Sequence, residues 1–114
     1  MRSRNVRQYV RLPVEAIVRI GWQDASREDK SALTRSFDIS ESGMRFELLE
    51  RLPLRSDVML RCDKLGLQTR AIVRYCGQKG LKYTIGVEFA GGYRWVPPNA
   101  EIRRAFEEAE VVMA

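Results

Sequence analysis

Apolar and polar residues alternate with a period of two along most of this chain. From Val14 to Ile20, the residues at every second position are apolar. This period predicts a β-strand with one buried face. The same pattern predicts further strands at residues 32–37, 44–48, 58–62, 67–76 and 82–89. Six strands without an intervening helix favour an antiparallel barrel or sandwich.

Polar segments separate the predicted strands. Residues 23–31 are polar without periodicity and predict a solvated hairpin loop, and residues 63–66 and 77–80 predict turns. In the segment Asp38–Gly43, Asp and Ser can bond to their own backbone and Gly can supply a positive φ, so we expect a tight turn. Gly86 lies inside the last strand and indicates a bulge, a barrel corner or a close approach by another group.

The C-terminal segment has a helical period instead. Asn99 follows two prolines and predicts a helix N-cap, and the Glu101 carboxylate suits the first turn. Apolar residues then recur at spacings of four, three and four: Ile102, Phe106, Ala109 and Met113. We expect a helix whose apolar face packs on the barrel, and the alternative is a partner-binding or self-association helix.

Composition excludes several classes of protein. The chain has 114 residues, of which 45% are hydrophobic and 31% charged, as expected of one globular domain. It contains no histidine, which excludes His-based triads and His-ligated metals. Cys62 and Cys76 are too few for a thiolate zinc site and are expected to be reduced core thiols. We therefore expect neither an enzyme, nor a metal site, nor a cofactor.

The same composition bears on location. No apolar run approaches the roughly 20 residues that a bilayer span requires, and the N-terminus lacks the apolar core of a signal peptide. We expect a cytoplasmic protein without membrane insertion.

Positive charge is concentrated at the N-terminal end. The net charge is +5, and Arg2, Arg4, Arg7 and Arg11 all precede the first acid, Glu15. Residues 1–11 thus carry +4, which leaves 5 − 4, or +1, for the rest. This basic head, defined as residues 1–13, indicates an anionic partner; a solubilising tail is the alternative.

Two short motifs suggest what that partner is. Arg7 and Arg11 form an Arg-x-x-x-Arg motif directly before the first strand, where two guanidinium groups can converge on one ligand. Asp38, Ser40 and Gly43 form an Asp-x-Ser-x-x-Gly motif between the second and third strands. Taken singly, the first motif is more typical of a solvated tail, and the second is more typical of an ordinary turn.

In this order and spacing, the two motifs resemble the signature of the PilZ domain, a bacterial receptor module for cyclic di-GMP. The segments Gly43–Phe46 and Ile85–Phe89 also look like PilZ strand sequences, and the resemblance spans about residues 4–106. It implies an all-β fold with a C-terminal helix, built on a six-stranded antiparallel Greek-key barrel. The implied organisation is a flexible basic head at residues 1–13, the barrel at 14–98, and a helix at 99–114 that packs on it.

The chemistry of the motif residues suits cyclic di-GMP, which has two phosphodiesters and two guanines. Arginine can bind phosphate or the guanine O6/N7 edge through two donors, and the resemblance assigns these contacts to Arg7 and Arg11. The Asp38 carboxylate can accept from guanine N1 and N2, which would discriminate against cyclic di-AMP. The Ser40 hydroxyl can bond to phosphate or to the turn backbone, and Gly43 permits a close backbone approach.

Several further residues are candidates for accessory contacts. These are Arg4, Gly86 and Tyr9, which could cover a guanine. The other conspicuous aromatic residues, Trp22, Tyr75 and Tyr83, are predicted to pack in the core or at the barrel rim. Family members often carry a further arginine where this chain has Val6, so the binding of one ligand or of a stacked pair stays open.

The function implied by the resemblance is that of a non-enzymatic receptor. Ligand binding would reorder the basic head over the barrel and alter a surface that contacts an unidentified protein effector, with motility, exopolysaccharide or biofilm as the output. We expect a monomer or weak homodimer. The alternative is a PilZ-like adaptor that binds protein without nucleotide, although such members usually lack both motifs. DNA or RNA binding is not expected, because aromatic and basic residues do not interleave on the strands.

Overall fold

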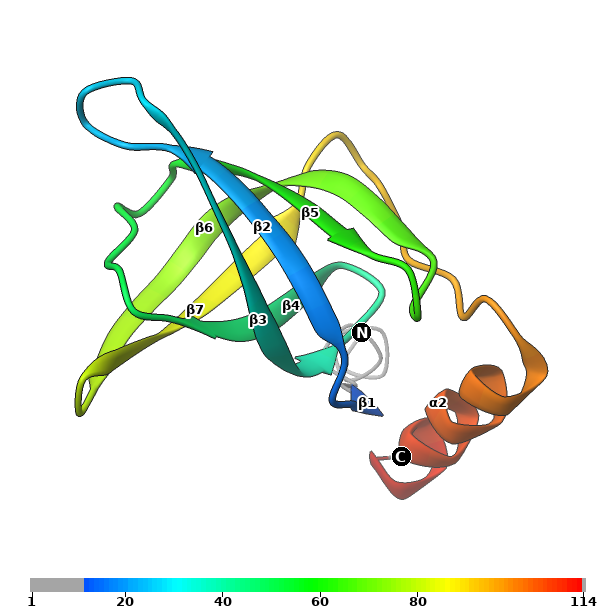
Figure 1. Ribbon diagram of the computed structural model, residues 1–114. Helices are drawn as coiled ribbons and strands as arrows, with labels where there is room; N and C mark the ends of the chain where they lie inside the picture. The colour runs from blue at the N-terminus through cyan, green and yellow to red at the C-terminus, as the bar shows by residue number, and fades with distance from the viewer. Residues whose placement is uncertain (1–11, 114) are drawn as a thin grey trace, which may run out of the picture.

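The computed structural model of the chain describes residues 12–113, which form a β-barrel followed by a helix (Figure 1). The predictions for Arg4, Val6, Arg7, Tyr9 and Arg11 concern residues outside this range. Within residues 12–113, no helix is both long and apolar enough to cross a bilayer.

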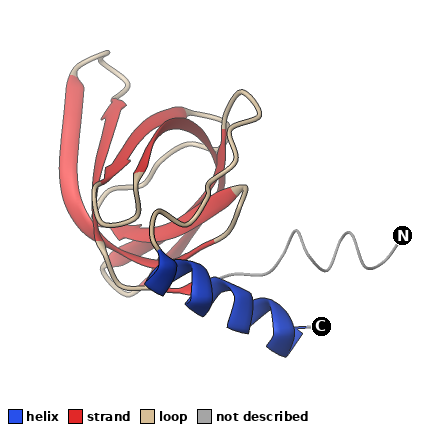
Figure 2. Ribbon diagram, turned by 90° about the vertical axis from the view of Figure 1, so that its right-hand side faces the viewer, coloured by secondary structure: helices blue, strands red, loops and turns tan. Residues whose placement is uncertain are grey.

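Six antiparallel strands form the barrel: β2 (Ile17–Gln23), β3 (Asp29–Ile39), β4 (Gly43–Leu48), β5 (Asp57–Cys62), β6 (Leu67–Lys79) and β7 (Lys82–Phe89). A two-residue strand, β1 (Leu12–Pro13), pairs with the end of β3, and helix α2 (Ala100–Met113) follows the barrel. Around the barrel the order is β3-β2-β5-β6-β7-β4, and β4 pairs back with β3 to close the ring. Figure 2 shows this ring, with α2 beside it. The predicted six-stranded barrel is confirmed.

Several strand boundaries differ from the predicted ones. The first long strand begins at Ile17 instead of Val14, because the Ser36 hydroxyl of β3 inserts between β3 and the segment that precedes Ile17. It donates to the Val14 carbonyl (3.0 Å) and accepts from the Ala16 amide (3.3 Å). The alternation from Val14 to Ile20 therefore continues through a local break in the regular strand pairing.

Two predicted connections are shorter than expected, because backbone pairing continues through polar residues. The hairpin between β2 and β3 closes within residues 24–28, where the Asp24 carboxylate accepts from the amides of Ser26 (2.8 Å) and Glu28 (3.0 Å). Strand β6 likewise runs through Gly77, and the turn lies at Gly80, whose φ is 64°. Solvent-exposed strand ends carry no apolar alternation, so periodicity alone underestimates their length.

The segment after β7 closes one end of the core. Trp95 is buried, and its indole N–H donates to the Leu65 carbonyl at 2.7 Å. Its ring meets Phe106 of α2 edge-on, with the ring centroids 5.7 Å apart. Residues 91–95 thus include the aromatic residue that joins the barrel to the helix. The Asn99 side chain accepts from the Ile102 amide (2.9 Å), which confirms the predicted N-cap.

Both cysteines are free thiols. Cys62 is buried in the barrel, where burial raises the pKa of its thiol, and Cys76 is partly buried against the core. Trp22 and Tyr83 also pack partly buried against the core, as predicted.

Candidate functional site

The Asp-x-Ser-x-x-Gly segment links β3 to β4, and its turn is shorter than predicted. Asp38 is still part of β3, only residues 40–42 form the turn, and Gly43 is the first residue of β4. The buried Ser40 hydroxyl accepts from the amides of Ser42 (3.3 Å) and Gly43 (3.2 Å). Of the two bonding roles expected for Ser40, this structure contains the one to the turn backbone.

Gly43 is required for a different reason than a turn conformation. A Cβ atom at this position would collide with the carbonyl oxygen of Val87 on the neighbouring strand β7. The backbone is extended here, so the expectation of a positive φ at Gly43 is wrong. The close approach that glycine permits is made between β4 and β7, and it holds this part of the barrel together.

Asp38 and Arg45 form a cross-strand pair. They lie opposite each other on β3 and β4, and Nε and Nη2 of Arg45 both donate to Oδ2 of Asp38, Nε at 3.0 Å. The Asp38 side chain is only 8% exposed, whereas that of Arg45 is 48% exposed. The hydrogen bond to Asp38 raises the pKa of Arg45, so this guanidinium stays charged. The carboxylate therefore lies beneath a guanidinium that faces solvent.

Strand register extends this pair into a row across four strands. Arg45 lies opposite Gly86 on β7, and Gly86 lies opposite Tyr75 on β6. Because Gly86 has no side chain, a gap separates Arg45 from Tyr75. A Cβ atom at Gly86 would lie 3.4 Å from Cβ of Tyr75 and 4.0 Å from Cγ of Arg45, so it would fill this gap without a collision. The bulge that Gly86 suggested lies opposite it, in β6, where the register shifts before Tyr75.

Tyr75 lies on the outside of the barrel, so its predicted packing in the core or at the rim is wrong. Tyr75 is 57% exposed to solvent. The Tyr75 ring runs along β6 and lies above Gly77. Glycine leaves room for it there, since a Cβ atom at position 77 would collide with the Tyr75 hydroxyl. Gly77, below the ring, and Gly86, opposite Tyr75 on β7, are the sequence signals that could have identified this exposed aromatic side chain.

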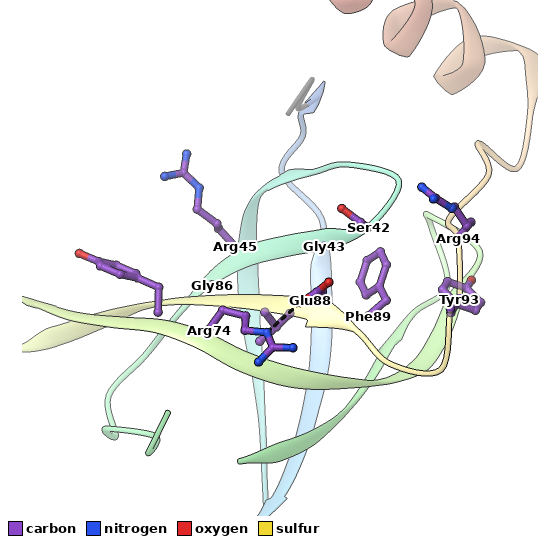
Figure 3. Close-up of a pocket in the computed structure, with 12 residues that line it drawn as sticks. Ser42, Gly43, Arg45, Arg74, Gly86, Glu88, Phe89, Tyr93 and Arg94 are labelled. Atoms are coloured by element: carbon purple, nitrogen blue, oxygen red, sulfur yellow. Dashed lines mark hydrogen bonds and ion pairs between the residues drawn. The ribbon is translucent and has the colours of Figure 1, made fainter. Parts of the chain in front are cut away.

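A groove of about 700 Å³ lies over β4, β6 and β7 beside this row, as Figure 3 shows. Gly43 and Gly86 contribute bare backbone to it, and Tyr93 lines its far end. Each of its three arginines pairs with a carboxylate: Arg45 with Asp38, Arg74 with Glu88 (2.7 Å) and Arg94 with Glu41 (3.2 Å). These three pairs cancel in charge, so the lining can offer hydrogen-bond donors without a net positive charge.

Residues 12–113 contain no cluster of three His, Cys, Asp or Glu side chains that could hold an ion. The groove offers bare backbone, an exposed aromatic ring and arginine donors. This combination is suited to binding a planar polar molecule.

A closed antiparallel barrel that carries such a groove beside its motif turn defines a binding domain. Residues 5–93 match the PilZ domain, and the chain belongs to this family. PilZ domains are binding and adaptor domains. No curated protein matches the chain.

Solved structures share the fold at low sequence identity. An inhibitor of motility from Bacillus subtilis, MotI/DgrA, is 18% identical with a TM-score of 0.59, over 90% of this chain and 48% of that one. MrkH of K. pneumonia is 16% identical with a TM-score of 0.55, over 93% of this chain and 48% of that one. MrkH in its apo state has a TM-score of 0.53 at 16% identity, over 90% of this chain and 49% of its own. The chain therefore spans about half the length of these proteins.

Proposed function

We propose that this chain is a cyclic di-GMP receptor that holds its ligand between the basic head and the groove. The observation that carries the proposal is the pairing of β1 with β3, in which Leu12 lies opposite Ile39 and Pro13 opposite Asp38. Arg11 directly precedes Leu12, so covalent geometry alone keeps their Cα atoms about 3.8 Å apart. In this proposal the two motifs, far apart in the sequence, therefore meet on one side of the barrel.

The charge distribution supports a division of labour between the head and the groove. The arginines of the groove are already paired with carboxylates, whereas residues 1–11 carry four arginines and no acid. The two ligand phosphates would therefore be bound by the head, through Arg7 and Arg11. Because that attraction is between exposed charges, it weakens as salt concentration rises.

The gap beside Gly86 supports the binding of a base. A guanine over the bare backbone at Gly86 would lie between the side chains of Tyr75 and Arg45, and the Tyr75 ring, which lies above Gly77, would turn toward the base to stack on it. Stacking of a base on an aromatic side chain contributes about 1–3 kcal/mol. In this proposal Tyr75 joins the residues predicted from the sequence as part of the ligand site.

The output of the receptor would be a contact with a protein effector. In this proposal the chain acts in the cytoplasm as a monomer or weak homodimer, and ligand binding orders the basic head over the barrel. The structural likeness to an inhibitor of motility supports motility as one controlled output, beside exopolysaccharide or biofilm formation.

Isothermal titration calorimetry tests the proposal. Cyclic di-GMP should bind saturably, and cyclic di-AMP and GMP should bind far more weakly. Arg11→Ala should lower the affinity about 10-fold or more, because charged hydrogen bonds contribute about 1.5–3 kcal/mol. Arg19→Ala is the matched control: it removes the same charge from the far side of the barrel, and we expect less than about a 2-fold change.

Each other outcome has a clear meaning. Absence of heat at about 100 μM cyclic di-GMP would contradict the proposal, and the adaptor that binds protein without nucleotide would become the leading function. The measured stoichiometry would decide between one ligand and a stacked pair.

A further inference from the structure

Arg45 is the groove residue best prepared to meet a ligand. Its guanidinium is fixed from below by the buried Asp38 carboxylate, while about half of its side chain is exposed. Figure 3 shows the side chain extending outward from β4 beside Gly86. A donor that is already held in one conformation loses less entropy on binding than a free side chain does.

The donors of Arg45 are only partly used. A guanidinium has five N–H donors, and both of the bonds that Arg45 makes within residues 12–113 go to one oxygen, Oδ2 of Asp38. The side of the guanidinium turned away from Asp38 therefore keeps donors for another acceptor. Since Gly86 places no side chain next to it, the Arg45 side chain adjoins the gap that ends at Tyr75, with its Cγ 4.0 Å from the place a Cβ atom of residue 86 would take.

The pairing with Asp38 also determines which acceptor suits Arg45. Its charge is already balanced, so it gains less from a phosphate than an arginine without a carboxylate partner does. A pair of neutral acceptor atoms can bond to the donors of Arg45 without needing an unbalanced positive charge. The O6 and N7 atoms of guanine are two such acceptors, and arginine bonds to both at once. Adenine presents an N6 donor in place of O6, which would face the guanidinium donors unfavourably.

We propose that Arg45 reads the O6/N7 edge of a guanine lying over Gly86, and that Asp38 acts on the ligand through Arg45. This inference rests on the proposed function. It makes Arg45 a specificity-determining residue and Asp38 a positioning residue, a different role from the direct contact with guanine N1 and N2 expected from the sequence.

Arg45→Lys tests the contact, because lysine keeps a positive charge above Asp38 but lacks the planar pair of donors. Its affinity for cyclic di-GMP should be about 10-fold lower or more. The specific readout is an analogue of cyclic di-GMP in which carbon replaces N7 of both guanines. The unmodified protein should bind this analogue about 10-fold more weakly than cyclic di-GMP, whereas Arg45→Lys should bind the two within about 2-fold.

Arg70→Lys is the matched control. Arg70 lies on β6 and is likewise an exposed arginine paired with a carboxylate, that of Asp57 (3.6 Å), but it is not part of the groove lining. We expect its affinity to change less than about 2-fold and its preference for the natural ligand over the analogue to stay. An equal loss in both lysine variants would overturn the inference in favour of general electrostatics.

A double-mutant cycle tests the role of Asp38. If Asp38 acts through Arg45, Asp38→Asn should weaken binding in the unmodified protein but change it less than about 2-fold in the Arg45→Lys background. Independent losses that multiply would show a direct contact and overturn the positioning role. If Asp38→Asn prevents folding, the analogue comparison with Arg45→Lys still decides the contact made by Arg45.

The failure of this inference is distinct from that of the proposed function. If the unmodified protein binds no cyclic di-GMP, both are overturned. If it binds, and Arg45→Lys neither weakens binding nor removes the preference over the analogue, the inference alone is overturned.

Discussion

Two faces of the barrel carry arginine in different surroundings. On the outside of β4, β6 and β7, the three arginines of the groove each have a carboxylate partner, and glycines leave the backbone bare between them. On the outside of β2, β3 and β5, Arg19 lies directly opposite Arg61. Within residues 12–113, Arg19 makes no ion pair, and Arg61 pairs only with the exposed Asp63.

Apolar side chains also differ between the two faces. Next to Arg19, Ile17 and Leu33 are 58% and 61% exposed and lie beside the charged side chains. In the groove, the strand positions beside Arg45 are occupied by glycine instead. Absent side chains let a planar molecule approach the backbone closely. Around Arg19, the β2–β3–β5 face presents exposed side chains to such a molecule instead.

The largest effect expected from breaking this difference is on stability, at Gly43. Gly43→Ala places a methyl group against the Val87 carbonyl, and both are backbone-fixed. We expect the unfolding free energy to fall by about 3 kcal/mol, as for overpacking of a closed interface. Urea denaturation followed by circular dichroism measures this change. A loss below about 1 kcal/mol would mean that β4 and β7 separate easily, and that Gly43 has another role.

A smaller effect is expected at Gly86, and on binding instead of folding. Gly86→Ala fills the gap between Arg45 and Tyr75 without a collision, so the unfolding free energy should stay equal or rise by up to about 1 kcal/mol. Cyclic di-GMP affinity should fall about 10-fold, because the base can no longer lie against the backbone.

Gly21→Ala is the matched control for that substitution. Gly21 also lies inside a strand with room for a methyl group, its nearest neighbour being Cβ of Met59 at 3.8 Å, but it belongs to the β2–β3–β5 face. Calorimetry should give unchanged affinity for Gly21→Ala. Equal losses in the two variants would mean that the binding site is not in the groove.

The smallest effect concerns the arginine pair on the other face. Arg19→Thr removes a like-charge contact with Arg61 and introduces a residue with high strand propensity. The unfolding free energy should rise by about 0.5 kcal/mol at low salt, and the gain should shrink at about 1 M salt as the repulsion is screened. A gain that does not depend on salt would assign the effect to strand propensity alone.

Sequence pattern was sufficient for the strand count, the helix with its Asn99 N-cap, and the motif turn after Asp38. Each of these is a local property, since alternation, capping and turn chemistry act between residues a few positions apart. Their boundaries were less accurate where strands extend into solvent, as at the ends of β2 and β3, because no buried face marks those residues.

The groove, in contrast, was decided by tertiary structure. Asp38, Arg45, Gly86 and Tyr75 come from four strands, and only the register of their pairing aligns them. Ala71 and Val73 point inward, so simple alternation would bury Tyr75 as well; the bulge in β6 between Val73 and Tyr75 turns it outward. One extra residue in a strand reverses every side chain after it. The sequence by itself thus determined a PilZ-like barrel with its two motifs, and strand register determined which side chains form the surface beside them.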